Sequence, residues 1–312
     1  MAVARVNGTT LTYTDQGTGD PVIMVMGTGS PGHVWHLHQT PALVAAGYRV
    51  ITFDNRGLSP DSGTPEIDDL VGDLAGLAET LCGGRCRLVG VSMGAHIVQE
   101  LLLKRPELVE QAVLMATRGR PDHFRARLAA AEAELNFGPV DLPVAYGAAL
   151  RAVLSLSPHT LNDEGRARHW LDLFELFPTA KAVMRAQHKL EIMESRLADY
   201  RAIRGRCLVV GFEDDLITPP HLGQEVATAI PGARYAQVAK CGHYGYMEQP
   251  DEVNSLIVDF FATGTPGTPG TAGTPGTAGT AGTAGTPGTP GTPGTPGTAG
   301  TTGTAGTTGT AV

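Results

Sequence analysis

The first part of the chain alternates short apolar runs with amphipathic stretches. Residues 2–16 alternate between polar and apolar positions around Asn7-Gly8, a pair that favours the tight turn of a β-hairpin. Later runs are apolar without alternation, which is typical of strands covered on both faces. These predicted strands are residues 22–26, 49–53, 88–91, 111–117, 206–211 and 234–238.

Helical patterns fill several of the intervals between these runs. A short helix is expected over 41–46. Residues 67–81 place Leu70 and Leu74 at helical spacing, so that one helix face is apolar and the opposite face is acidic. A further unbroken helical stretch covers 95–103. Strands that alternate with helices predict an α/β fold with a mostly parallel, doubly wound sheet.

The predicted strand over 88–91 leads into Gly90-Val91-Ser92-Met93-Gly94, a G-x-S-x-G sequence followed directly by a helix. This is the pattern of a nucleophile elbow, a sharp strand-to-helix turn that exposes one serine in strained backbone. A Cβ at either glycine position would collide with neighbouring backbone. The string alone is a modest signal, and its strand-and-helix context makes Ser92 the candidate nucleophile.

A serine hydroxyl is a weak nucleophile at neutral pH, so it needs a base and an acid that orients the base. Elbow folds supply the acid and then the base on loops after later strands. Here Asp214-Asp215 follows the strand over 206–211, and Gly242-His243 follows the strand over 234–238. His243 is therefore the candidate base, and one of the two aspartates is the candidate acid.

With this order of residues the chain resembles the α/β-hydrolase superfamily over residues 1–261. In that family the acid usually lies four residues before a proline, which favours Asp215 and leaves Asp214 as the reserve. Some members carry the acid after the sixth strand, where this chain has Asp122. The resemblance implies an α/β-hydrolase fold and a Ser92-Asp215-His243 triad.

The resemblance also implies an oxyanion hole of two backbone N–H groups, which would receive the negative charge of acyl transfer. One donor is the residue after the nucleophile, Met93. The other lies on the loop after the strand over 22–26, where the family usually has His-Gly and this chain has Met26-Gly27. Thr28 is the expected donor and Gly29 is the alternative. The loop lacks the lysine of a P-loop and the spacing of a dinucleotide site, so no nucleotide role is expected.

Residues 118–205 carry helical, charged patterns and no strand signal. The resemblance implies that this segment forms a lid over the serine and that its apolar side chains line a hydrophobic pocket. For any single apolar residue there, packing between lid helices is the simpler explanation. The residues expected to contact substrate are Gly27, Gly29, Trp35, Trp170, Phe174 and Tyr244.

The remaining histidines and cysteines favour structural roles. His36 and His38 form a weak metal signal, because no further ligand lies at a suitable spacing. His96 follows the candidate nucleophile by four residues, and a buried structural histidine is the simpler interpretation. Cys82 and Cys86 have no second ligand pair. Neither a metal nor an organic cofactor is expected.

Composition changes sharply near the carboxyl end. From Gly264 to Gly309 every third residue is glycine, followed by threonine and then by proline, alanine or threonine. This stretch has no large aliphatic, aromatic or charged residue, so it cannot bury a core that offsets its ordering entropy. A collagen triple helix is the alternative for such a period. Because proline never follows glycine directly, residues 262–312 are predicted to be a disordered tail.

The net charge of −8 belongs to the first 261 residues, since the tail is uncharged. This acidic balance argues against a nucleic-acid partner or an anionic membrane surface. No apolar stretch reaches membrane-spanning length and no apolar signal segment opens the chain. With only four cysteines, the sequence predicts a cytoplasmic protein, and it gives no oligomeric state.

These features predict a cofactor-free serine hydrolase of the carboxylesterase kind, which cleaves an ester or thioester of a hydrophobic small molecule through an acyl-enzyme. Resemblance to stand-alone actinobacterial hydrolases suggests natural-product metabolism. Carbon–carbon bond hydrolases share the loop after residue 26, although they usually have tryptophan where this chain has Tyr244. Perhydrolases, also called haloperoxidases, share the triad. A non-catalytic binder on the same scaffold is the alternative of another class.

Overall fold

Eight strands form one sheet in the part of the chain that the structure describes, which is residues 1–58, 63–191 and 193–263 of a computed structural model. The strand order across the sheet is β1-β2-β4-β3-β5-β6-β7-β8. The β1–β2 and β2–β4 pairs are antiparallel, and all other neighbours are parallel. The strands are β1 (Ala2–Val6), β2 (Thr9–Gln16), β3 (Pro21–Val25), β4 (Arg49–Phe53), β5 (Cys86–Val91), β6 (Val109–Met115), β7 (Arg206–Phe212) and β8 (Arg234–Val238).

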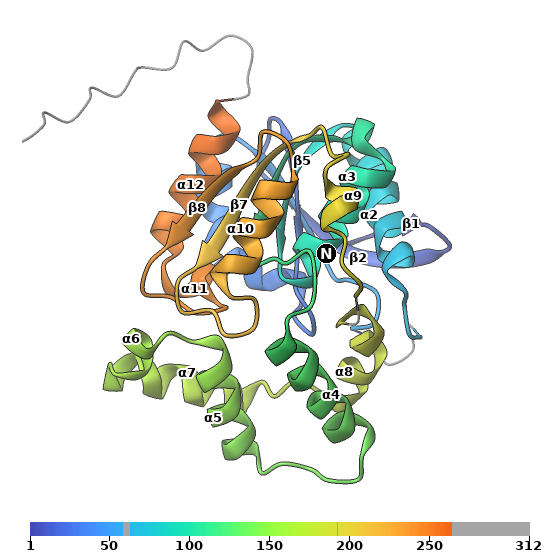
Figure 1. Ribbon diagram of the computed structural model, residues 1–312. Coiled ribbons are helices and arrows are strands. Elements are labelled where there is room, and N and C mark those ends of the chain that lie inside the picture. The colour runs from blue at the N-terminus through green and yellow to red at the C-terminus, as the bar shows by residue number, and fades with distance from the viewer. Residues whose placement is uncertain (59–62, 192, 264–312) are drawn as a thin grey trace, which may run out of the picture. The chain divides into compact units, whose positions relative to one another are not determined.

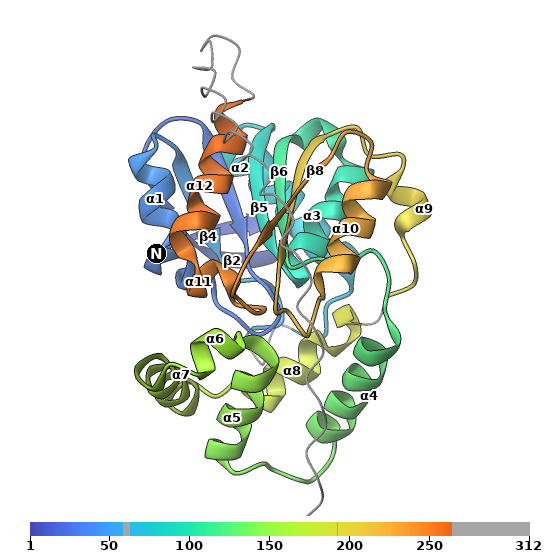
Figure 2. The ribbon, with the colours of Figure 1, turned by 60° about the vertical axis from the view of Figure 1, so that its left-hand side comes forward.

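Helices cover both faces of this sheet, as the continuous apolar strands predict. Along β3, Ile23 and Val25 face a core shared with α2, α3 and α10, whereas Val22 and Met24 face a core shared with α1 and α12. Figures 1 and 2 show these two layers. The predicted α/β fold with a mostly parallel, doubly wound sheet is confirmed. The helices are α1 (Gln39–Ala45), α2 (Ile67–Cys82), α3 (Met93–Lys104), α10 (Pro220–Ala229), α11 (Gly245–Glu248) and α12 (Pro250–Ala262).

Local turn chemistry accounts for the first hairpin and for two shifted boundaries. Asn7 and Gly8 have φ of 45° and 72°, the left-handed pair that a two-residue hairpin turn requires. The strand predicted over 111–117 begins and ends two residues earlier, and Ala116, just beyond it, has φ of 48°. The helix predicted from residue 95 begins at Met93, directly after the turn at Ser92.

Among the described residues between β6 and β7, all regular structure is helical. Helices α4 to α8 gather at one end of the sheet in Figures 1 and 2, whereas α9 packs beside α3 and α10. The helical insertion therefore stands off the sheet only in its α4–α8 part. Its small core joins α5 and α7 through Ala148, Ala152, Leu156, Trp170 and Phe174. The bounds are α4 (His123–Phe137), α5 (Val144–Ser155), α6 (Pro158–Leu161), α7 (Glu164–Leu176), α8 (Lys181–Gln187) and α9 (Leu197–Tyr200), with 3-10 turns at Gly32–Leu37, Pro106–Leu108 and His188–Glu191.

Two further predictions from the sequence concern the carboxyl-terminal segment and membrane-spanning helices. Ala262, the first residue of the predicted tail over 262–312, is the last residue of α12 instead. Residues 264–312 lie outside the described residues, so the disorder of the tail stays a prediction. No helix in the described ranges combines the length and the apolar character that a bilayer crossing requires.

Candidate active site

Ser92 occupies the turn between β5 and α3, with φ of 56° and ψ of −119°. The two flanking glycines make this turn possible. A Cβ at Gly94 would lie 2.1 Å from the carbonyl oxygen of Val25, and a Cβ at Gly90 would lie 2.5 Å from that of Gly94. A non-glycine residue at positive φ is held there only by its surroundings. Ser92 therefore has the strained strand-to-helix position that the nucleophile-elbow pattern predicts.

A cavity of about 430 Å³ lies between Ser92 and the helical insertion. Its walls include Ser92, His243 and the loop at Gly27-Thr28, together with side chains from α4, α5, α7 and α8. This volume falls in the range of small-molecule sites, which are about 300–1,000 Å³. The candidate nucleophile and base thus share one cavity, and side chains of the insertion form part of its wall.

His243, on the loop after β8, is hydrogen-bonded to Asp215 on the loop after β7. The distance from Nδ1 of His243 to Oδ2 of Asp215 is 2.8 Å. A carboxylate only accepts hydrogen bonds, so Nδ1 carries the proton in this contact when the imidazole is neutral. Nε2 is then the basic nitrogen of the ring.

Three further hydrogen bonds fix the Asp215 carboxylate, whose side chain is fully buried. Its Oδ1 accepts from the backbone N–H groups of Ile217 and Thr218, both at 2.8 Å. Its Oδ2 accepts from the Thr218 hydroxyl at 2.8 Å, and that hydroxyl lies 3.3 Å from Nδ1 of His243. Sequence reasoning missed Thr218, although its place three residues after an aspartate is typical of such a turn.

The two alternative aspartates have other partners. Asp214 accepts a hydrogen bond from the hydroxyl of Ser157, in the insertion, at 2.6 Å. Asp122 accepts from the backbone N–H of Arg125 at 2.6 Å and caps the amino terminus of α4. Of the three carboxylates considered from the sequence, the structure brings only Asp215 to His243.

The loop after β3 runs directly over the elbow. A Cβ at Gly27 would lie 3.2 Å from Cβ of Ser92 and 3.8 Å from its Oγ. Thr28 lines the cavity, whereas the Gly29 N–H donates to the side-chain oxygen of Gln187 at 2.7 Å. Met93 is the first residue of α3, so its N–H points out of the helix end. The N–H of Gly29 therefore already has an acceptor in the insertion, and the oxyanion role of Met93 and Thr28 stays a prediction.

Hydrogen bonds from the turn after β4 support this loop. Asn55 donates to the carbonyl of Met26 at 2.9 Å, and the Asp54 carboxylate accepts from the N–H of Gly32 at 2.8 Å. Gln187 of α8, which sequence reasoning missed, also donates to the carbonyl of Arg56 at 3.1 Å. The loop is thereby attached to both the sheet and the insertion.

The predicted substrate contacts divide into two groups. Gly27, Phe174 and Tyr244 line the cavity, whereas Gly29 and Trp170 do not appear in its wall. Trp170 packs behind that wall, with its ring centroid 5.3 Å from Phe174 and 6.0 Å from Tyr244.

Trp35 does not line the cavity, so its predicted contact with substrate is wrong. Its side chain is fully buried in the core that includes residues of α12, and its ring centroid lies 5.1 Å from that of Tyr246. The 3-10 turn Gly32–Leu37 directs the indole toward the sheet and away from the cavity.

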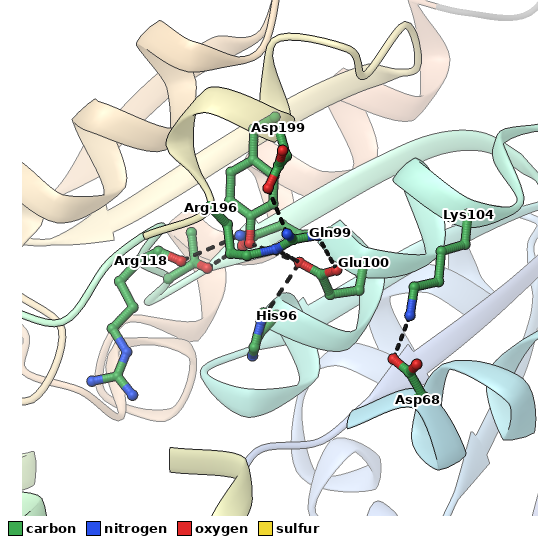
Figure 3. A network of polar contacts seen from close by, with 10 residues as sticks. Asp68, His96, Gln99, Glu100, Lys104, Arg118, Arg196 and Asp199 are labelled. Atoms are coloured by element: carbon green, nitrogen blue, oxygen red, sulfur yellow. Dashed lines mark hydrogen bonds and ion pairs between the residues drawn. The ribbon is translucent and has the colours of Figure 1, made fainter. Parts of the chain in front are cut away.

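Two histidines outside this site, His96 and His36, have polar partners. His96 lies 3.8 Å from a carboxylate oxygen of Glu100, which also forms two hydrogen bonds with Arg196, at 2.8 and 3.0 Å (Figure 3). This network ties the end of the insertion to α3. Nε2 of His36 lies 3.0 Å from the Thr14 hydroxyl and 2.9 Å from that of Thr52. In the described ranges, no group of three or more His, Cys, Asp or Glu side chains is placed to hold a metal.

Glu248 connects the loop of His243 to the insertion. One of its carboxylate oxygens accepts from the N–H of Gly242 at 2.7 Å, and the other accepts from the N–H of Ser157 at 3.0 Å. The N–H of Tyr244 also donates to the carbonyl of Ser155, at 3.1 Å. Sequence reasoning missed the contact between Glu248 and Ser157 because these residues lie 91 positions apart and carry no local pattern.

Comparison with known proteins gives the family. The model of the alpha/beta hydrolase family matches residues 22–256, and a model described as collagen triple helix repeat matches residues 262–311. A relative from Mycobacterium tuberculosis H37Rv, named "Putative non-heme bromoperoxidase BpoC", is 46% identical over 256 residues, which cover 81% of this chain and 98% of the relative.

A solved structure of this relative and one further relative add to the comparison. A crystal structure of BpoC from the same organism has a TM-score of 0.79 and covers 82% of this chain and 96% of its own. A 2-hydroxy-6-oxononadienedioate/2-hydroxy-6-oxononatrienedioate hydrolase of Burkholderia vietnamiensis is 28% identical over 277 residues, which cover 80% of this chain and 89% of that protein. The matches agree on the fold, and the names of the proteins differ in the reaction.

Proposed function

The chain belongs to the alpha/beta hydrolase family, and from that premise we propose that it is a cofactor-free serine hydrolase. Its substrate is an ester or thioester of a small, largely hydrophobic molecule, cleaved through an acyl-enzyme. The proposal rests on one arrangement above all. Asp215 and His243 are joined by a 2.8 Å hydrogen bond, and His243 lines the same cavity as a serine held at φ of 56°.

In this mechanism each side chain has one role. Nε2 of His243 takes the proton of Ser92 as Oγ attacks the substrate carbonyl, and Asp215 holds the proton on Nδ1. The N–H groups of Met93 and Thr28 stabilise the oxyanion, a contribution that is worth about 3–4 kcal/mol for each donor in comparable sites. His243 then protonates the leaving group, and water releases the acyl group from Ser92.

The cavity walls favour an apolar acyl or leaving group. Phe174 and Tyr244 contribute aromatic surface, and Leu154 and Met184 contribute aliphatic surface. The insertion acts as a lid over the reacting serine, and closure of such a site excludes water from the developing charge. We expect a small-molecule substrate and no nucleic-acid or membrane partner.

Labelling by a fluorophosphonate, read by intact-mass spectrometry, tests the proposal. The unmodified protein should acquire one stoichiometric adduct, Ser92→Ala should acquire none, and His243→Ala should react more slowly, because the base that activates the serine is missing. An adduct that persists in Ser92→Ala, or its absence from well-folded unmodified protein, would contradict the proposal. A non-catalytic binder would then be the better account.

A second candidate, perhydrolase activity, is favoured by the name of the Mycobacterium tuberculosis relative. Hydrogen peroxide would replace water as the nucleophile that attacks the acyl-enzyme, which yields a peroxy acid and free Ser92. The peroxy acid would then oxidise bromide to hypobromite and return to the carboxylate. Bromination should depend on added carboxylate as well as peroxide, and it should be lost in Ser92→Ala.

Carbon–carbon bond hydrolysis is the third reaction to test. The Burkholderia vietnamiensis relative is named for a 2-hydroxy-6-oxo-dienedioate substrate. A panel that sets esters, thioesters and such diketones against the same enzyme preparation, with Ser92→Ala as the blank, would rank the three reactions by kcat/KM.

A further inference from the structure

We propose that Arg151 and Tyr244 form an anion-binding subsite in the cavity and that the substrate carries a carboxylate that binds there. The inference rests on the proposed hydrolase function and adds to it a substrate class, an ester or thioester with a free carboxylate away from the scissile bond.

Arg151 projects from α5 into the cavity wall with its guanidinium already oriented. Its Nη2 and Nε donate to the hydroxyl oxygen of Tyr244 at 2.8 and 3.2 Å, and its Nη1 donates to the carbonyl of Phe177 at 3.3 Å. Its central carbon lies 4.3 Å from the ring centroid of Phe174. A guanidinium has five N–H groups. Two of them therefore have no acceptor among the residues that the structure describes.

Tyr244 is likewise left as a donor. Its hydroxyl oxygen accepts two hydrogen bonds from Arg151, which occupy both of its lone pairs. The Tyr244 O–H must then point elsewhere, and none of the described residues accepts a hydrogen bond from it. The pair thus presents only donors to the cavity that both residues line.

The charges around the cavity single out Arg151. Two other cationic side chains line it, and each has a carboxylate partner: Arg125 lies 2.9 Å from Glu132, and Lys181 lies 2.8 Å from Asp141. Arg151 forms no ion pair within the described parts of the chain. Arg151 is half-buried, so its charge is available to an anion that enters the cavity. Guanidinium groups match carboxylates in charge and in planar geometry.

The pair lies in the same cavity as the candidate nucleophile and base. Tyr244 follows His243 directly, and the two ring centroids lie 6.2 Å apart. Ser92, Arg151 and Tyr244 line the same cavity, so one small molecule could place its carboxylate at the pair and its scissile carbonyl at the serine. A dicarboxylic acid esterified at one end has this form.

Matched pairs of 4-nitrophenyl esters test the subsite. The charged members are the monoesters of succinic, adipic and suberic acids, and the neutral members are esters of the monocarboxylic acids of equal length. The readout is the ratio of kcat/KM, charged over neutral, at each length. Arg151→Gln should lower this ratio by about 10- to 100-fold, as expected when charge-assisted hydrogen bonds are lost, and Tyr244→Phe should lower it less. Arg168→Gln, an exposed arginine on α7, is the control and should not change the ratio.

Other outcomes would distinguish a failure of the proposed anion-binding subsite from a failure of the proposed hydrolase function. If Arg151 only supports the cavity wall, Arg151→Gln lowers both rates equally, the ratio stays constant, and the subsite is refuted while the hydrolase function stands. If no ester is cleaved, calorimetric titration of Ser92→Ala protein with adipate decides. Binding that weakens at least tenfold on adding Arg151→Gln supports the subsite, and binding that is absent or unchanged overturns it. Failure of the fluorophosphonate label would refute the hydrolase function independently.

Discussion

Replacing Asp215 by asparagine isolates the role of one carboxylate oxygen. The side chain keeps its size, but one oxygen becomes an NH₂ group. The backbone N–H groups of Ile217 and Thr218, both 2.8 Å from Oδ1, require an oxygen at that position. The amide nitrogen must therefore face Nδ1 of His243, where the carboxylate had accepted a hydrogen bond.

This orientation reverses the tautomer of the imidazole. An NH₂ group donates to Nδ1, so Nδ1 must carry the lone pair, and the ring proton moves to Nε2. A protonated Nε2 cannot accept the proton of Ser92. The corresponding loss in triads of this kind is about 10⁴-fold in kcat. At 1.36 kcal/mol per factor of ten, this equals about 5.4 kcal/mol of barrier.

The assay is steady-state hydrolysis of a 4-nitrophenyl ester, with Asp214→Asn as the matched control. Asp214 is the adjacent carboxylate, and its partner is the Ser157 hydroxyl. We expect Asp215→Asn to lower kcat by about 10³-fold or more with little change in KM, and Asp214→Asn to lower it by less than about tenfold. Equal losses in the two variants would refute the assignment of Asp215 and the tautomer argument with it.

Three further predictions concern stability. Glu248→Ala leaves the buried N–H groups of Gly242 and Ser157 without an acceptor. At about 1–3 kcal/mol for each group, the free energy of unfolding measured in urea should fall by about 2–6 kcal/mol. Glu248→Gln keeps one acceptor and should lose less, so equal losses in the two variants would contradict this account. Gly94→Ala should abolish folding or lower Tm sharply, since its Cβ would meet a carbonyl at 2.1 Å, whereas Gly147→Ala, with open space around it, should not. Burial, together with the nearby His33, lowers the pKa of His36 below 6.5, so in acid the native state binds fewer protons than the unfolded chain. The contribution of His36 to the free energy of unfolding should therefore be complete above pH 6.5 and decrease below it. His36→Gln should flatten the dependence of Tm on pH in that range.

The sequence predicts the parts of the molecule that short-range rules determine. The strands, the hairpin at Asn7-Gly8 and the elbow at Ser92 each depend on a few adjacent residues, and the structure has all three. The contact between Asp215 and His243 can also be predicted from the sequence, because parallel strands bring the loops at their carboxyl ends to one edge of the sheet.

Long-range packing explains what the sequence could not predict. Trp35 looked like a pocket residue because it lies close to the loop after β3, but a single 3-10 turn decides the side on which an indole is buried. The N–H of Gly29, the alternative to Thr28 as a donor, binds the side chain of Gln187, which lies 158 residues away in the sequence. No local pattern identifies such a partner.

The residues proposed for the reaction and those proposed for substrate recognition also differ in how far the sequence predicts their positions. The residues proposed for bond cleavage lie on loops at the edge of the sheet, where strand order constrains them strongly. Arg151 and Phe174 come from the insertion, whose helices pack mainly on one another and whose sequence carries the weakest pattern. The insertion meets the reacting residues at the loop of His243, through Glu248 and through the hydroxyl of Tyr244. A change in the insertion can therefore alter which acid is recognised and leave the order of serine, aspartate and histidine intact, which fits relatives that share this fold under names for different reactions.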